Sequence, residues 1–297
     1  MSIIDYYNEI KERLINNEII KRAKDYSKNK SDLNTYYEVG KMLSSAGKHY
    51  GEGIINKYSV KLVKEVDKKY NVTNLKRYRQ FYYMIEKGAP LGHQLTWSHY
   101  RELLPIKDIN KIRYYINQSI NRNLTKRQLM DIIRNGEYER LPEKTRNYSL
   151  EKIISKIEDY IKRPIIIKNS FGISDISEKV LQRLILEDIS SFMNELGEGF
   201  SFIGNEYKIK IGDRYNYIDL LLYNIKYNCY VVVELKITEL KKEHIGQIET
   251  YMNYIDKELK RIDHDKTIGI IIVKKDNNFI MEYCSDSRII KTTYKIV

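Results

Sequence analysis

Residues 215–236 read YNYIDLLLYNIKYNCYVVVELK, two apolar stretches separated by a polar run at 224–228. This pattern predicts an antiparallel β-hairpin whose turn lies in the polar run. Side chains alternate between the two faces of a strand, so Glu234 and Lys236 are expected to point the same way. Pairing about the centre of the turn places Asp219 opposite Glu234, or within one pair of it. The hairpin is therefore expected to bring two carboxylates and an amine together.

Both carboxylates lie in apolar surroundings, Asp219 in YIDLLLY and Glu234 in CYVVVELK. Burying a charged group without a partner costs several kcal/mol. A shared divalent cation explains the pair, because Mg²⁺ prefers oxygen ligands from carboxylates and water. The alternative is a structural salt bridge to Lys236.

Other groups of the hairpin suggest further roles. The backbone carbonyl of Leu235 is expected to be an additional metal ligand, and Lys236 is expected to orient water and offset charge in a transition state. Together these residues form the set that a metal-dependent phosphodiesterase requires. Alternation also predicts that Asp219 shares a face with Tyr215, Tyr217 and Leu221.

The chain has 297 residues, of which 42% are hydrophobic, enough for two ordinary domains. Its net charge of +12 is uneven: residues 1–150 hold 29 Lys and Arg against 17 Asp and Glu, whereas residues 151–297 hold 23 of each. A one-sided basic surplus attracts polyanions such as nucleic acid. The alternative is a lysine-rich surface that only faces water.

The cysteine content and hydropathy favour a cytoplasmic protein. Cys229 and Cys284 are the only cysteines and lack the spacing of a zinc site, so both are expected to be reduced thiols. No apolar run approaches the roughly 18 residues of a membrane span, and the N-terminus does not resemble a signal peptide. No membrane association is expected.

The N-terminal half is expected to be mainly helical. The predicted helices cover residues 4–28, 31–45, 53–69, 73–87, 96–104, 108–121 and 125–136. Residues 58–86 resemble a helix-turn-helix whose second helix is capped by Thr73 or Asn74 and carries Lys76, Arg77 and Arg79 as DNA contacts. The alternative is that these three basic residues only face solvent. In LTWSHY, Trp97 and His99 are interpreted as packing residues.

The pattern changes after a charged stretch bracketed by Pro142 and Pro164. One amphipathic helix is predicted over 180–196, ended by Gly197. The elements expected after it are a strand at 200–211, the hairpin, a helix at 243–259, a strand at 267–273, and short strands near 279–283 and 289–295. This order is α-β-β-β-α-β, and its helical crossover lets the last core strand lie parallel to the third.

The segment GFSFIGNEYKIKIGDRYNYIDLLLYNIKYNCYVVVELKITELKKEHIGQIETYMNYID (199–256) resembles the nuclease domain of YhcG-type proteins, a branch of the PD-(D/E)XK superfamily. YGEGIINKYSVKLVKEV, NLKRYRQFYYM and LTWSHYRELLPIKD resemble the uncharacterised N-terminal domain of that family. The resemblance implies that Asp219 takes the aspartate position of the motif, and that Glu234 and Lys236 take its (D/E)xK. Ile218 stands where the superfamily usually has proline.

The same resemblance suggests further site residues. Gln247 and Tyr251 match GQ-x-x-x-Y in the helix after the hairpin, where the glutamine often assists catalysis. The first core helix of the superfamily often supplies an acidic residue. Here Glu178 is the candidate, because Gln182 occupies the neighbouring position where relatives tend to have Glu. Glu206 is a second candidate for metal binding.

These observations predict a basic helical domain at 1–140, a connector at 141–170 and a PD-(D/E)XK nuclease domain at 171–297, with a mixed sheet flanked by helices. The expected function is a bacterial, Mg²⁺-dependent DNA endonuclease, with Mn²⁺ as a substitute, acting in defence, restriction, or DNA repair and recombination. A homodimer is expected, because cutting two strands takes two sites. The alternatives are an inactive DNA-binding or protein-interaction module, and a nuclease for branched DNA or RNA.

Overall fold

The computed structural model describes residues 3–22, 28–51, 53–92, 94–147, 156–282 and 286–297. The chain forms two compact units, Met1–Tyr138 and Glu139–Val297. None of the helices in the described part of the chain is long and apolar enough to cross a membrane.

The first unit is helical, as the sequence predicts. Its helices are α1 (Ile3–Arg22), α2 (Lys28–Tyr50), α3 (Ile54–Glu65), α4 (Val72–Glu86), α5 (Trp97–Leu103), α6 (Ile109–Asn121) and α7 (Lys126–Arg134). Trp97 packs against Tyr36 and Tyr78, with ring centroids 5.0 and 5.3 Å apart. His99 is buried, and its Nε2 lies 3.0 Å from the carbonyl oxygen of Leu124. Both residues therefore have the packing role that the sequence predicts.

The cap of α4 differs from the prediction. The side-chain oxygen of Asn71 accepts a hydrogen bond from the backbone N–H of Asn74 at 3.1 Å, so Asn71 is the N-cap rather than Thr73 or Asn74. Asn71 has an extended backbone, which lets its side chain fold back over the first turn. The helix consequently begins at Val72, slightly earlier than expected.

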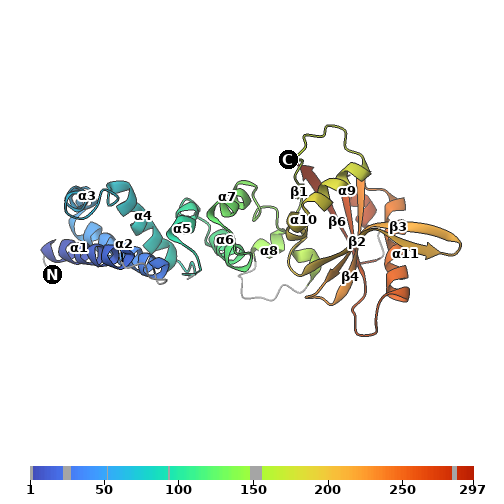
Figure 1. Ribbon diagram of the computed structural model, residues 1–297, viewed down its shortest axis with the longest axis horizontal. Helices are drawn as coiled ribbons and strands as arrows, with labels where there is room; N and C mark the ends of the chain where they lie inside the picture. The colour runs from blue at the N-terminus through green and yellow to red at the C-terminus, as the bar shows by residue number, and fades with distance from the viewer. Residues whose placement is uncertain (1–2, 23–27, 52, 93, 148–155, 283–285) are drawn as a thin grey trace. The chain divides into compact units, whose positions relative to one another are not determined.

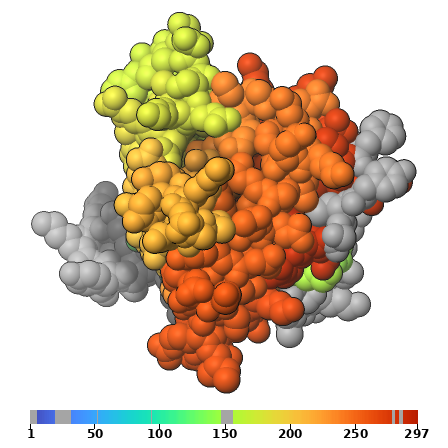
Figure 2. All heavy atoms as spheres, turned by 90° about the vertical axis from the view of Figure 1, so that its right-hand side faces the viewer, coloured from blue at the N-terminus to red at the C-terminus, as the bar shows by residue number. Residues whose placement is uncertain are grey.

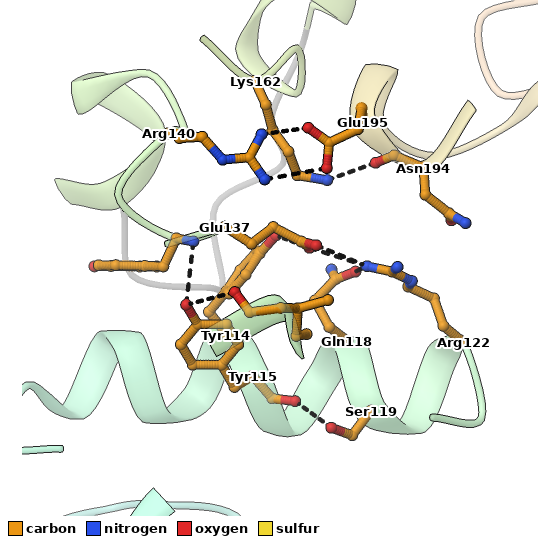
Figure 3. A network of polar contacts seen from close by, with 12 residues as sticks. Tyr114, Tyr115, Gln118, Ser119, Arg122, Glu137, Arg140, Lys162, Asn194 and Glu195 are labelled. Atoms are coloured by element: carbon orange, nitrogen blue, oxygen red, sulfur yellow. Dashed lines mark hydrogen bonds and ion pairs between the residues drawn. The ribbon is translucent and has the colours of Figure 1, made fainter. Parts of the chain in front are cut away.

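A buried acidic residue also stabilises the first unit. Glu137 is 2% exposed and accepts hydrogen bonds from the Tyr114 hydroxyl at 2.7 Å and from Arg122 at 2.9 Å (Figure 3). The guanidinium compensates the carboxylate charge that burial would otherwise make costly.

The second unit is a six-stranded mixed sheet with helices against it (Figure 1). Its strands are β1 (Ile165–Ile167), β2 (Phe200–Ile211), β3 (Arg214–Asn224), β4 (Cys229–Glu239), β5 (Ile268–Lys275) and β6 (Ile289–Ile296), in the spatial order β1-β6-β5-β4-β3-β2. The pairs β2–β3 and β3–β4 are antiparallel, and the other pairs are parallel. β5 lies parallel to β4, as the helical crossover predicts.

Helices cover both faces of this sheet. They are α9 (Glu178–Glu187), α10 (Ile189–Leu196), α11 (Lys242–Glu258) and α12 (Asn278–Glu282). Two short helices, α8 (Glu143–Asn147) and a 3-10 helix at Ile157–Asp159, precede β1 in the chain. On one face, Val231, Val233 and Leu235 pack with apolar residues of α9 and α10. On the other face, Val232 and Ile271 pack with α11. Glu234 and Lys236 lie two and four residues after Val232 on the same strand, so alternation directs them to this second face.

The expected connector, 141–170, is not a simple linker, because part of it belongs to the sheet. Ile165–Ile167 forms the edge strand β1 beside β6, and Ile157 and Ile161 are buried in the same core cluster. Arg140 forms a two-pronged ion pair with Glu195 of α10 (Figure 3), and Glu195 also accepts the N–H of Ile166 at 2.9 Å. A three-residue strand is too short to show alternation, which is why the sequence pattern does not predict it.

Two further predictions were wrong. The helix expected over 180–196 is broken at Asp188, which leaves helical geometry (φ −131°, ψ 53°) and caps α10 by accepting the N–H of Ser191. The apolar period continues across this break and therefore hides it. The strand expected near 279–283 is the short helix α12, since a brief apolar run does not distinguish a strand from a helical turn.

Among the described residues, Cys229 is a free and buried thiol. Burial raises its pKa to about 12, which favours the inert, protonated form. Cys284, the other expected thiol, lies outside the described residues.

If β1 is part of the nuclease core, Ile165→Ala should destabilise the second unit by about 2–5 kcal/mol, because it removes a fully buried side chain from a packed cluster. Urea unfolding of the full chain measures this change. Ile262→Ala is the matched control, since Ile262 is fully exposed. Equal stability of the two variants would show that β1 does not belong to the core.

Candidate functional site

The hairpin forms with the predicted turn and register. Leu220 pairs with Val233, and Asn224 pairs with Cys229. The Asn224 side chain is buried and accepts the N–H groups of Lys226 and Tyr227 at 3.0 and 3.1 Å, which holds the turn. The register of the pairing is therefore set at the turn.

Asp219 and Glu234 lie side by side, one residue beyond the pair that Leu220 forms with Val233. The N–H of Asp219 points to Oε1 of Glu234 at 3.5 Å, and Oδ2 of Asp219 accepts the N–H of Leu235 at 2.7 Å. The Asp219 carboxylate thus accepts the Leu235 N–H, in place of a backbone carbonyl of β3, just where the pairing of the two strands ends. The two carboxylates meet there, as the hairpin pattern predicts.

Burial controls the protonation of both carboxyls. Glu234 is 1% exposed, and burial followed by the nearby charge of Asp219 raises its pKa to about 8. Burial also raises the pKa of Asp219, although the Leu235 N–H and Lys236 oppose the shift. The apolar strands therefore disfavour two negative charges at this position.

Lys236 supplies a positive charge to the pair. Its Nζ lies 3.2 Å from Oε2 of Glu234 and 4.0 Å from Oε2 of Glu178. Burial would lower the pKa of Lys236, but Glu234, Asp219 and Glu178 outweigh it and raise the pKa above its ordinary value. The lysine therefore stays protonated, and the salt bridge considered from the sequence is present.

The strand is distorted at Asp219, which corrects one expectation. Ile218 and Leu221 belong to the same core cluster, so side chains do not alternate regularly between these positions. Leu221 is fully buried while Tyr217 is 53% exposed, and the face expected to hold both with Asp219 is not continuous. Glu206, which lies between the pairing partners of Leu220 and Ile218, has a left-handed backbone (φ +45°). Both strands of the β2–β3 pair are thus irregular beside the site.

Helix α9 approaches the site with its N-terminal half. Ser177 caps this helix by accepting the N–H of Val180, and Glu178 is its first residue. Gln182 lies one turn further on, where its Nε2 donates to the backbone carbonyl of Asp219 at 2.9 Å. From the sequence, Gln182 stands out only as a replacement for Glu. Its hydrogen bond to Asp219 could not be predicted, because it depends on how α9 packs on the sheet.

Helix α11 closes the site from the other side. Gln247 donates to the hydroxyl of Tyr251 at 3.1 Å. Burial raises the pKa of Tyr251, with the charges of Glu234 and Asp219 acting in the same direction. The first turn of α11 holds His244, whose pKa is lowered by burial and then by Lys236 and Lys241. The sequence pattern connects Gln247 with Tyr251, and the structure brings these two side chains together.

The acidic side chains of the site form an incomplete metal-binding group. In the described ranges, no three His, Cys, Asp or Glu side chains are grouped so that they could hold a metal ion. Glu178 is half-exposed and faces Lys236, and Glu206 is exposed on the edge strand, so neither completes such a group.

The hairpin has three groups that could bind a metal: the carboxylates of Asp219 and Glu234 and the backbone carbonyl of Leu235. The N–H and C=O of one strand residue point to the same side, so the Leu235 carbonyl is directed toward β3. Buried carboxylates with raised pKa values and a carbonyl oxygen suit a hard divalent cation that keeps several waters.

The predicted DNA contacts lie on α4, in the first unit. Lys76 is exposed, whereas Arg77 and Arg79 are partly buried. Arg77 donates to the side chain of Asn74 at 3.2 Å. The three residues thus stand on one helix, but with different access to solvent.

Two protein-family models match the chain. Residues 158–296 match the family model described as "YhcG PDDEXK nuclease domain", and residues 10–140 match the one described as "DUF1016 N-terminal domain". The sequence is 23% identical to "Putative nuclease YhcG" of Escherichia coli (strain K12), over 80% of this chain and 75% of that protein.

Two solved structures are similar to part of the chain. A repair endonuclease from Pyrococcus abyssi is 19% identical with a TM-score of 0.29, covering 42% of this chain and 49% of that chain. An EndoMS–dsDNA complex is 18% identical with a TM-score of 0.29, covering 43% of this chain and 48% of that chain. The chain thus spans about half the length of these solved structures.

The mixed sheet, its flanking helices and the matched family model define the second unit as a nuclease domain of PD-(D/E)XK type. The family's N-terminal domain precedes it, and the two matches together cover most of the chain. The chain belongs to the YhcG-type PD-(D/E)XK nuclease family.

The raised pKa of Glu234 predicts how stability depends on pH in the metal-free protein. Between the ordinary pKa of 4.5 and about 8, the folded state keeps a proton that the unfolded state releases. The free energy of unfolding should therefore fall with rising pH, by about 1.4 kcal/mol per pH unit for one proton. The shift of Asp219 acts in the same direction, whereas Lys236 stays charged throughout this range.

Urea unfolding in EDTA across this range measures the slope. Glu234→Gln should flatten it, because the amide does not titrate. Glu258→Gln, which changes an exposed glutamate at the end of α11, should keep it. The same slope in the parent protein and in Glu234→Gln would show that Glu234 titrates normally.

Proposed function

We propose that the protein is a metal-dependent endonuclease that hydrolyses phosphodiester bonds in DNA. The observation that supports this most strongly is the meeting of Asp219, Glu234 and Lys236 where β3 and β4 separate. Two acids and a lysine in apolar strands are costly for stability alone, and their chemistry suits phosphate transfer.

In this proposal each residue of the hairpin has one task. Asp219 and Glu234, with the Leu235 carbonyl, hold a divalent cation. Lys236 orients the attacking water and offsets negative charge on the phosphate as the transition state forms. Gln182 acts on the backbone of Asp219 and is a positioning residue, since it does not reach the reacting atoms.

Mg²⁺ is the proposed cofactor, and Mn²⁺ is expected to substitute for it. Such an ion, when bound, supplies Lewis-acid stabilisation of the phosphate and lowers the pKa of bound water. It would also lower the pKa values of Asp219 and Glu234, because a nearby positive charge favours the ionised carboxylates.

DNA is the proposed substrate because of the charge distribution along the chain. Residues 1–150 carry the whole excess of 12 positive charges, and α4 presents Lys76, Arg77 and Arg79. Such a surplus attracts the phosphates of a nucleic acid. A homodimer, a cytoplasmic location and a role in bacterial defence, restriction or DNA repair stay predictions.

Lys236→Ala should lower the rate of DNA cleavage at least about 100-fold, because it removes a fixed charge that acts on the transition state. Asp219→Asn and Glu234→Gln should be inactive, and EDTA should stop the parent enzyme until Mg²⁺ or Mn²⁺ is added. Gel assays on supercoiled, linear, branched and single-stranded DNA measure these effects.

The matched controls for the cleavage assay are Lys257→Ala and Glu258→Gln, which change exposed residues of α11. Both should cut like the parent. Cleavage that persists in Asp219→Asn and in Lys236→Ala would overturn the assignment of the site. Binding without cleavage by the parent would favour an inactive module.

If α4 binds phosphates, replacing Lys76, Arg77 and Arg79 by Gln should weaken binding similarly on all DNA sequences. The slope of log affinity against log salt should become shallower by about one for each phosphate that the variant no longer neutralises. Fluorescence anisotropy over a salt series measures this slope. Replacing the exposed residues Arg101, Lys107 and Arg127 of the same unit is the control, and an equal effect of both triple variants would indicate a diffuse charge effect.

A further inference from the structure

The β2–β3 hairpin extends past the candidate site as an arm, defined here as residues 207–218. Lys208 pairs with Tyr217 and Lys210 pairs with Tyr215, and the turn follows at Gly212 and Asp213. Figure 1 shows this hairpin projecting beyond the other strands, and Figure 2 looks onto the side of the molecule from which it projects. The arm is part of the fold but has its own surface.

The two faces of the arm differ in chemistry. Ile209, Ile211 and Ile218 lie on the inner face and belong to or pack against the core cluster under α11. Cross-strand partners share a face, so Lys208, Lys210, Tyr215 and Tyr217 form the outer face. Both lysines are exposed, and the two tyrosines are 57% and 53% exposed. The inner face accounts for the stability of the arm, and the outer face is available for binding.

One contact organises the outer face. Nζ of Lys208 lies 3.8 Å from the ring centroid of Tyr215, within the range of a cation–π interaction. The lysine occupies one side of that ring and is held close to the strand. Tyr217 lies beside this pair, with half of its surface open to solvent.

The arm is basic within a domain of balanced charge. The arm contains three basic residues, Lys208, Lys210 and Arg214, and one acidic residue, Asp213. Residues 151–297 as a whole carry equal numbers of basic and acidic residues. Aromatic rings interleaved with basic side chains suit a nucleic acid strand, because the cations meet phosphates and the rings stack on bases.

Both strands of the arm run on into the candidate site, although the outer face lies opposite the α11 face to which Glu234 and Lys236 belong. Asp219 lies two residues beyond Tyr217, and Glu206 lies two residues before Lys208. At about 3.4 Å per residue, the two lysine–tyrosine pairs lie roughly 7 and 14 Å from Asp219. At about 3.4 Å per nucleotide, the rise along one strand of a duplex, these distances correspond to at most about two and four nucleotides from the cut, because unpaired nucleotides can extend further.

We propose that the outer face of the arm binds unpaired nucleotides next to the scissile phosphate, with a base stacked on Tyr217 and with Lys208 and Lys210 on the phosphates. This inference rests on the proposed nuclease function and names its substrate class: DNA with a single-stranded region beside the cut. In an intact duplex the bases are already stacked and present only their edges, so an upright tyrosine ring gains little. An unpaired base offers its whole ring face.

The test measures binding by the full chain in EDTA, by fluorescence anisotropy, on a blunt duplex and on the same duplex with a single-stranded gap. Tyr217→Ser should weaken binding to gapped DNA by about 5- to 150-fold, the range for loss of one stacked base, and should change duplex binding little. Tyr217→Phe should retain the parent's affinity, because stacking needs the ring and not the hydroxyl. Lys208→Gln together with Lys210→Gln should weaken binding and reduce its salt dependence.

Phe171→Ser and Lys257→Gln are the matched controls, since both residues are exposed in the same unit outside the arm. Unchanged affinity of Tyr217→Ser for gapped DNA would overturn the proposal, and so would an equal loss on both substrates. Thermal unfolding of each variant distinguishes lost binding from lost folding. If the arm variants behave as expected but the parent cleaves no DNA with Mg²⁺ or Mn²⁺, the nuclease function fails while the binding surface stands.

Discussion

The site depends on the burial of Glu234, which lies almost without solvent in the middle of an apolar strand. A carboxyl in this position either keeps its proton or needs a cation beside it. Lys236 supplies one charge, but Asp219 adds a second acid, so the lysine cannot balance both. At this position the Leu235 N–H donates to Asp219, and the pairing of β3 with β4 ends where the acids meet.

The two neighbours of β4 pair with different parts of it. β3 pairs with Cys229–Val233, whereas β5 continues along Glu234 and Lys236, so β5 supports the site residues where the pairing with β3 has ended. Helices α9 and α11 pack against opposite faces and bring Gln182 and Tyr251 toward the acids. Rigid strands therefore carry the charged residues, while helices supply the groups that orient them.

Much of this could be predicted from local patterns. The position of Asp219 beside Glu234 follows from hairpin symmetry, and the helices of the first unit follow from apolar periods. Family resemblance was needed to single out Gln247 and Tyr251. The hydrogen bond of Gln182, the break at Asp188 and the strand at 165–167 could not be predicted, because they arise from packing between distant segments or from runs too short to show a period.

The turn after β3 has a consequence for how such a protein can vary. Asn224 holds the turn, and the turn sets which residues face each other along both strands. A shift of one residue in the pairing would send Glu234 and Lys236 to the opposite face and replace them with Val233 and Leu235. An insertion or deletion in this short loop that shifts the pairing by one residue would therefore change the whole site at once. The length of the loop is as restricted as the acids themselves, although the loop acts on them only through the register of the strands.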